Sequence, residues 1–192
     1  SMRPEQWTKN LIVFAGLFFG TGFRSPQDIV LDGRIFVIFC LVSSGSYILN
    51  DLMDRKEDRL HPEKSRRPIA AGRLKSWPAI IASTLLMLTG LSMAWSIYFK
   101  LFLLVAGFIL LHILYDVSLK HIAVVDVFVI AFSFIIRLFS GVVMSPIENK
   151  LSSWILLCTF LLALFLALCK RRAEMAILQD VSKHHRRSLA DY

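Results

Sequence analysis

The chain has 192 residues, of which 56% are hydrophobic, and a mean hydropathy of +0.61, which excludes an ordinary soluble globular domain. Its formal net charge of +8 comes from 22 Lys and Arg against 14 Asp and Glu. That excess could indicate a nucleic-acid-binding protein, but the distribution of the cations described below argues for a membrane protein with no nucleic-acid partner.

Six long apolar blocks follow one another along the chain, at residues 11–23, 35–49, 77–99, 101–115, 122–144 and 151–169. A transmembrane helix needs about 20 predominantly apolar residues. The third, fifth and sixth blocks meet this length, and the other three extend into mixed flanks. We therefore expect an all-α integral membrane protein, a single domain over residues 1–192, with about six transmembrane helices.

The Lys and Arg residues are unevenly divided between the two sides of these six segments. The side that carries the N-terminus, the loops after the second and fourth segments and the C-terminus holds 17 of the 22 cations. Such an excess is typical of the cytoplasmic side of a multi-pass protein. We expect the functional site on this side, in the loops at about 50–76 and 115–122 and in the C-terminal segment 170–192.

An acidic motif follows directly on the second apolar block, with Asn50, Asp51, Asp54 and Asp58. If the helix continues, its three aspartates fall within roughly 60° of arc. Mg²⁺ prefers oxygen ligands and is often held by one or two carboxylates together with substrate phosphates. The motif therefore predicts a metal–phosphate site at a membrane surface. The alternative is a solvated, charge-rich helix end, since basic residues are interleaved.

The same loop then becomes basic, with Lys64, Arg66 and Arg67 within ten residues of the last aspartate. Pro62 and Pro68 interrupt helical structure here. Carboxylates that hold a metal, next to ammonium and guanidinium groups, are suited to binding a diphosphate. A basic loop that only sets the membrane topology is the alternative.

Two charged residues lie inside the fifth block. Asp126 is about one turn into it, and could complete a second metal site, form a salt bridge with Lys120 or face the interface. Arg137 lies eleven residues later, about 16 Å deeper. Its partner could be Asp126 through intervening groups, an anionic headgroup or a polar group of another helix.

A basic segment with Lys170, Arg171 and Glu174 follows the sixth block. It has the composition of an ordinary juxtamembrane basic collar. Glu174 is less expected in a segment that only binds lipid.

Together these motifs resemble those of the UbiA-type membrane prenyltransferases, and within them the branch that transfers phosphoribose to decaprenyl phosphate. The matching stretches are Asn50-Asp51-x-x-Asp54-x-x-x-Asp58, His61-Pro62-x-Lys64-x-x-Arg67-Pro68-Ile69-Ala70-Ala71-Gly72, Tyr115-x-x-x-Leu119-Lys120-His121 with Asp126, Lys170-Arg171-x-Ala173-Glu174 and Gln6-Trp7-x-Lys9-Asn10. The resemblance implies nine transmembrane helices around a central cavity. Since this chain supplies about six, we expect the C-terminal third of that fold to be missing from it.

The resemblance also implies a reaction, the Mg²⁺-dependent transfer of 5-phosphoribose from 5-phosphoribosyl 1-diphosphate to a polyprenyl phosphate. Diphosphate would be released, at the cytoplasmic side of a bacterial inner membrane, in the synthesis of cell-wall arabinan precursors. The candidate metal ligands are Asp51, Asp54 and Asp58. The candidate catalytic residues are these three with Lys120 and Asp126, and the candidate substrate-binding residues are Asn50, Lys64, Arg67, Tyr115, Arg137, Lys170, Arg171 and Glu174.

Two other functions stay open from the sequence. An aromatic prenyltransferase of the same family would use a polyprenyl diphosphate and the same carboxylates, but it would need fewer cations than a soluble donor with an additional phosphate. A transporter or membrane scaffold, whose charges only set the topology, would tolerate Asp54→Asn.

Overall fold

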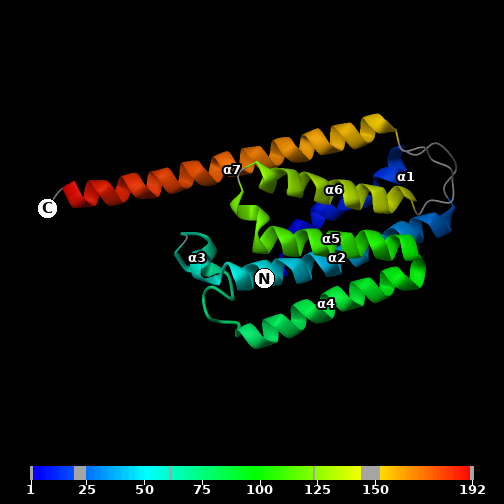
Figure 1. The fold of residues 1–192 in the computed structure, drawn as a ribbon, viewed down its shortest axis with the longest axis horizontal. Coiled ribbons are helices and arrows are strands. Elements are labelled where there is room, and N and C mark those ends of the chain that lie inside the picture. Colours follow the sequence, from blue (N-terminus) through cyan, green and yellow to red (C-terminus); the bar gives the residue numbers. More distant parts are fainter. Residues whose placement is uncertain (1, 20–24, 61, 123, 144–151, 191–192) are drawn as a thin grey trace.

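The computed structural model describes residues 2–19, 25–60, 62–122, 124–143 and 152–190, without the side chains of residues 121, 143 and 174–190. The described residues form helices joined by short connections (Figure 1). In chain order they are η1 (Pro4–Phe14), α1 (Ala15–Phe19), α2 (Pro26–Met53), α3 (Arg55–Leu60), η2 (Lys64–Arg66), α4 (Ser76–Ile97), α5 (Phe99–Val117), η3 (Leu119–His121), α6 (Val125–Val143) and α7 (Ser153–Ala190).

Five of these helices, α2, α4, α5, α6 and α7, are long and apolar enough to cross a membrane. They correspond to the last five of the six predicted segments, so the all-α membrane architecture is confirmed. The first segment differs from the prediction. Its described part consists of the end of the 3₁₀ helix η1 and the five-residue helix α1, and residues 20–24 lie outside the description. Apolar composition predicted a membrane-spanning segment here, but it does not specify which helix type the segment adopts.

Local signals set the ends of several of these helices. Ser25 caps the N-terminus of α2, because its side chain accepts from the backbone of Asp28 while the Asp28 carboxylate accepts from the backbone of Ser25. Pro26 occupies the first helical turn, where its missing N–H costs nothing. Between α4 and α5 a single extended residue, Tyr98, reverses the chain, so these two helices pack against each other.

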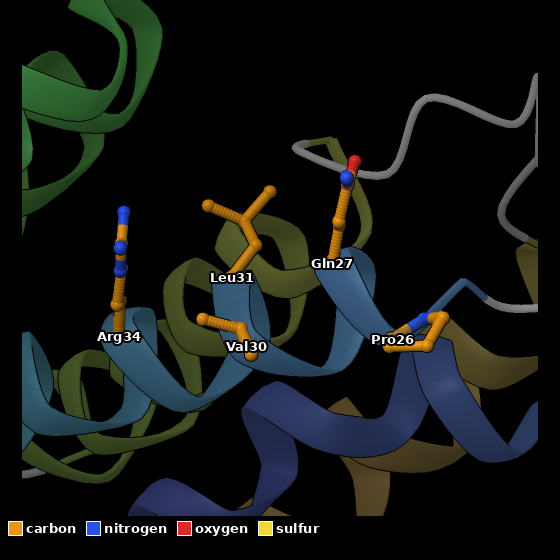
Figure 2. Close-up of a pocket in the computed structure, with 5 residues that line it drawn as sticks. All are labelled: Pro26, Gln27, Val30, Leu31 and Arg34. Carbon is orange, nitrogen blue, oxygen red and sulfur yellow. The ribbon is translucent and has the colours of Figure 1, made fainter.

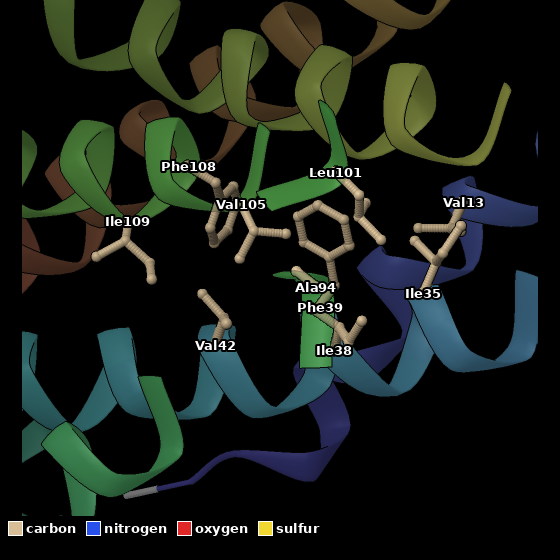
Figure 3. Packing of buried hydrophobic residues seen from close by; sticks show 10 residues of the cluster. All are labelled: Val13, Ile35, Ile38, Phe39, Val42, Ala94, Leu101, Val105, Phe108 and Ile109. Carbon is tan, nitrogen blue, oxygen red and sulfur yellow. The ribbon is translucent and has the colours of Figure 1, made fainter. Parts of the chain in front are cut away.

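The core forms where η1, α2, α4 and α5 meet (Figure 3). Phe39 of α2 meets Phe108 of α5 edge to face, with ring centroids 5.3 Å apart. Around them lie the other members of this cluster, Val13, Ile35, Ile38, Val42, Ala94, Leu101, Val105 and Ile109. More of the residues are buried in α2 and α6 than in α4, α5 and α7, which carry many exposed apolar side chains. That exposed apolar surface is what lipid would cover.

The close approach of η1 to α6 depends on one glycine. A Cβ at Gly141 would lie 2.0 Å from the carbonyl oxygen of Val13. We expect Gly141→Ala to lower the free energy of unfolding by about 1–3 kcal/mol, because η1 and α6 would have to separate. Gly107 in α5 is the matched control, since nothing lies within 4 Å of its Cβ position. Gly107→Ala should leave stability unchanged or raise it by about 1 kcal/mol. Denaturant titration in detergent measures both, and equal effects would contradict the prediction.

The loops that were predicted to share one side do lie together. The N-terminus, α3, the connection from α5 to α6 and the C-terminal half of α7 occupy the same end of the bundle (Figure 1). The connection between α4 and α5 lies at the other end. The candidate motifs are therefore brought to one end of the molecule by the alternating direction of the helices.

Candidate functional site

Two nearly inaccessible carboxylates lie at the end of α2 and in α3. Asp51 is 1% exposed and Asp58 is 4% exposed. Nη1 of Arg67 joins them, donating to Oδ2 of Asp58 at 2.7 Å and to Oδ1 of Asp51 at 3.3 Å. Burial raises the pKa of Asp58 above its usual range, although the hydrogen bond and charge of Arg67 act against that shift. The predicted proximity of acidic motif and basic loop is therefore seen at these residues.

The helical spacing of the aspartates continues across the break between α2 and α3. Helix α2 ends at Met53 and Asp54 is its C-terminal cap. The backbone N–H of Asp54 still donates to Asn50 at 2.9 Å, and that of Asp58 donates to Asp54 at 2.8 Å. This continuity carries the helical order from α2 into α3, so that the motif behaves nearly as the continuous helix that was predicted.

Arg3 is a second cation on Asp51, which the sequence analysis did not identify. Its guanidinium hydrogen-bonds Oδ1 of Asp51 and lies over the ring of Tyr47, 5.2 Å from the centroid. Arg3 has a left-handed backbone, with φ of 50°, immediately before η1 begins at Pro4. No local pattern indicates this contact, because the two residues are 48 positions apart.

Asp54 belongs to a separate group of side chains that joins α2 to α5. Nζ of Lys120 hydrogen-bonds its Oδ1. Nδ2 of Asn50 donates to Oδ2 of Asp54 at 3.1 Å and to Oδ1 of Asp116 at 2.7 Å. The motif residues Asn50, Asp54 and Lys120 thus belong to one group of contacts, with Asp116 as an additional member.

Asp126 belongs to a third group, which joins α5, α6 and α7. Nε of Arg171 donates to Oδ2 of Asp126 at 2.5 Å, and its Nη2 donates to Oη of Tyr115 at 3.0 Å. Of the alternatives left open for Asp126, the salt bridge with Lys120 is replaced by one with Arg171. Arg171 therefore links two other candidate residues, Tyr115 and Asp126, to α7.

The remaining candidates at this end lie in η2 and α7. Lys64 is half-buried in η2, and Lys170 is exposed on α7. Glu174 lies in α7, and its side chain is outside the described residues.

Arg137 lies away from these groups, buried between η1, α5 and α6. It is 2% exposed. Its Nε donates to Oδ1 of Asn10 at 2.8 Å, its Nη1 donates to the carbonyl and hydroxyl of Ser133 at 3.1 Å, and its guanidinium lies 4.6 Å from the ring centroid of Phe108. Three partners were left open for Arg137 by the sequence. The structure shows the third of them, a polar group of another segment, which is Asn10 of η1.

The donor set at this end of the bundle suits a hard cation. Within the described residues no three His, Cys, Asp or Glu side chains already form a metal-binding group, and the aspartates pair with cations instead. Yet Oδ2 of Asp51 and Oδ2 of Asp116 are buried with no hydrogen-bond donor. A buried carboxylate oxygen without a donor is costly. Carboxylate oxygens are the ligands that Mg²⁺ prefers, so these residues fit a divalent cation.

A pocket of about 430 Å³ lies elsewhere, on the first turns of α2 (Figure 2). Its lining residues are Pro26, Gln27, Val30, Leu31 and Arg34. Arg34 precedes Asp51 by 17 positions on the same helix, a rise of about 26 Å. The pocket is therefore remote from the carboxylates and contains none of the candidate residues.

Comparison with known proteins identifies relatives over almost the entire chain. The model of the UbiA prenyltransferase family matches residues 10–191. The chain is 36% identical over 196 residues to the decaprenyl-phosphate phosphoribosyltransferase of Mycolicibacterium smegmatis, covering 100% of this chain and 61% of that protein. The enzyme of the same name from Mycobacterium tuberculosis (strain H37Rv) is also 36% identical, with 64% of its length covered. This chain thus spans about three-fifths of the length of these curated relatives.

A solved structure shows the same fold. The UbiA homolog from Archaeoglobus fulgidus bound to DMAPP and Mg²⁺ matches with a TM-score of 0.72 and 25% sequence identity. The match covers 85% of this chain and 58% of that one. The predicted UbiA-like helical bundle is therefore confirmed for this part of the fold.

Proposed function

Because the chain belongs to the UbiA prenyltransferase family, we propose that it transfers 5-phosphoribose from 5-phosphoribosyl 1-diphosphate to a polyprenyl phosphate in a Mg²⁺-dependent reaction. The identity of 36% to decaprenyl-phosphate phosphoribosyltransferases over the whole chain supports this reaction and makes decaprenyl phosphate the natural acceptor. The basic end of the bundle would face the cytoplasm of a bacterium. The product would then supply cell-wall arabinan synthesis, as the family resemblance implies.

The main support for the proposal is that carboxylates form ion pairs with cations from separate parts of the chain. Asp51 contacts Arg3 and Arg67, and Asp54 contacts Lys120. The carboxylates would hold a divalent cation that neutralises the charge of a diphosphate. The neighbouring guanidinium and ammonium groups would be available for the phosphate oxygens, to which they are well matched. The ion pairs thus hold both sets of charges close to where the donor would need them.

The transfer exchanges one C–O bond for another at C1 of the ribose. An oxygen of the lipid phosphate forms the new bond to C1, while the bond from C1 to the diphosphate breaks and its electron pair leaves with the diphosphate. A bound Mg²⁺ would neutralise charge that develops on the leaving group. Asp51, Asp54 and Asp58 are the candidates to hold it.

The protein's own groups have two further tasks in this proposal. Positive charge grows at C1 as the leaving group departs, and a neighbouring carboxylate, with Asp126 as the candidate, would stabilise it. Because the acceptor phosphate is already an anion, it needs no general base. Tyr115 and Lys120 are the candidates to hold a phosphate group near the reacting carbon.

The 5-phosphate and ribose hydroxyls of the donor need further polar groups. Lys64, Lys170, Arg171 and Glu174 are the candidates, because a soluble sugar phosphate presents more charge and more hydroxyls than an isoprenoid diphosphate. Arg137 is a weaker candidate than these, since binding a headgroup would require it to leave Asn10 and Ser133.

The experiment uses the purified chain in lipid nanodiscs, with Mg²⁺, a polyprenyl phosphate and 5-phosphoribosyl 1-diphosphate labelled in the ribose. We expect label to enter the lipid phase, and EDTA to prevent this. Labelled ribose 5-phosphate, which lacks the diphosphate, is the matched control and should give no transfer. Prenylation of an aromatic acid from a polyprenyl diphosphate, without phosphoribosyl transfer, would contradict the proposal and favour the aromatic prenyltransferase.

A further inference from the structure

Asp116 is a buried carboxylate that belongs to none of the sequence motifs. It lies in the last turn of α5 and is 3% exposed. Its Oδ1 accepts from Asn50, whereas its Oδ2 is buried and has no hydrogen-bond donor. A carboxylate is rarely left in this state, because withdrawing the charge from water without a partner is costly.

The unsatisfied oxygen lies beside the acidic motif. A single nitrogen, Nδ2 of Asn50, donates to Asp116 at 2.7 Å and to Asp54 at 3.1 Å. The distance between the two accepting oxygens is therefore no larger than the sum of these two distances. Two carboxylates at such a separation repel each other unless positive charge lies near both. Lys120 hydrogen-bonds Asp54, and Asp116 retains an oxygen for another partner.

We propose that Asp116 is a further ligand of the divalent-cation site, supplied by α5 opposite Asp54 at the C-terminal end of α2, and that Asn50 positions both carboxylates. This rests on the proposed function, since it concerns the same cation. Its chemistry is that of hard oxygen ligands around Mg²⁺ or Mn²⁺. Asn50 acts on the cation through the carboxylates, as residues around metal ligands commonly do. A site with ligands from two helices also explains why α2 and α5 meet through polar groups at this end.

A purely structural role makes the opposite prediction. If Asp116 only accepted the hydrogen bond of Asn50, Asp116→Asn would leave cation binding unchanged, since an amide oxygen also accepts. If Asp116 is a ligand, the variant loses affinity for the cation. Without the cation, its melting temperature should equal or exceed that of the wild type, because a buried charge has been removed.

The test is a titration of the purified full chain in detergent with Mn²⁺ alone, with free Mn²⁺ followed by electron paramagnetic resonance. We expect Asp116→Asn to weaken binding at least about 10-fold and Asn50→Ala to weaken it about 10-fold. Glu57→Gln is the matched control. It removes one negative charge from an exposed position of α3 and should change affinity less than about twofold, because solvent and salt screen an exposed charge.

Either of two results overturns the proposal, wild-type affinity in Asp116→Asn or no Mn²⁺ binding by the wild-type chain. Melting in EDTA verifies that the variant is folded. If Asp116→Asn does not fold, Asn50→Ala decides, and unchanged affinity in that variant overturns the proposal. The readout is independent of transfer. Weakened Mn²⁺ binding in Asp116→Asn, together with no transfer by the wild type, would retain this inference and reject the proposed function. Wild-type Mn²⁺ affinity in Asp116→Asn, together with transfer by the wild type, would reject this inference and retain the proposed function.

Discussion

Asp54→Asn should reduce phosphoribosyl transfer by about 10²–10³-fold, the range found when one group that stabilises charge in a transition state is removed. The substitution keeps the size of the side chain and one of the two oxygens that accept from Lys120 and Asn50, but it replaces the other oxygen with an amide nitrogen and removes the negative charge that a divalent cation needs. The initial rate of label transfer into lipid, at several Mg²⁺ concentrations, measures the effect. Because cation binding is weakened, raising Mg²⁺ should recover part of the rate.

Glu57→Gln is the appropriate control for this loss as well. Glu57 lies three positions after Asp54, and Glu57→Gln removes the same charge as Asp54→Asn. The side chain of Glu57, however, is exposed on α3. We expect its transfer rate to stay within about twofold of the wild type, since exposed charges are screened by salt. Wild-type activity in Asp54→Asn would contradict the metal role of the acidic motif. It is the result that a transporter or scaffold predicts.

The sequence predicted the five membrane-spanning helices because each depends on composition and length, which are local properties. It also predicted correctly that the charged loops lie at one end, since alternating helices leave no other arrangement. The first segment could not be predicted in the same way. The close packing of η1 against α6 at Gly141 is a tertiary contact that no periodicity in residues 11–23 indicates.

Within the site, the sequence predicted which residue types meet, but not the individual pairs. The contacts Arg3–Asp51 and Asn50–Asp116 join residues 48 and 66 positions apart. Helical spacing tells which face of a helix carries a residue. Which neighbouring helix meets that face, and at what height, depends on packing of the complete core. For this reason Arg3 and Asp116 were missed, although both lie beside predicted motifs.

For Arg137, too, the local sequence predicts the kind of contact but not the residue that makes it. A charge in the middle of an apolar segment predicts a polar partner, and the structure contains one. The partner is Asn10, 127 positions away in η1, which also donates to Sγ of Cys40 at 3.3 Å and accepts from Ser43 at 3.4 Å. The contacts of Arg137 therefore favour a role in attaching η1 to α2 and α6 over a direct role in substrate binding.

This role predicts an asymmetric mutant cycle. Asn10→Leu should lower the free energy of unfolding by about 3 kcal/mol, because it leaves a buried guanidinium without its acceptor on η1. Arg137→Met should cost less, about 1–2 kcal/mol, since it removes the charge and leaves Asn10 with the weaker contact from Ser43.

The double variant Asn10→Leu/Arg137→Met should then be more stable than the sum of the two losses predicts, by about 1–3 kcal/mol. Replacing both partners with apolar groups of similar size removes the interaction and the desolvated charge together, which is often nearly neutral. Denaturant unfolding in detergent, with all four proteins in parallel, measures this coupling. Additive losses would show that Arg137 and Asn10 act independently, and that η1 is held in place by its apolar contacts alone. A coupled cycle would instead place a polar contact at the centre of the bundle, linking the segment that carries Arg3 to the helices that carry the aspartates.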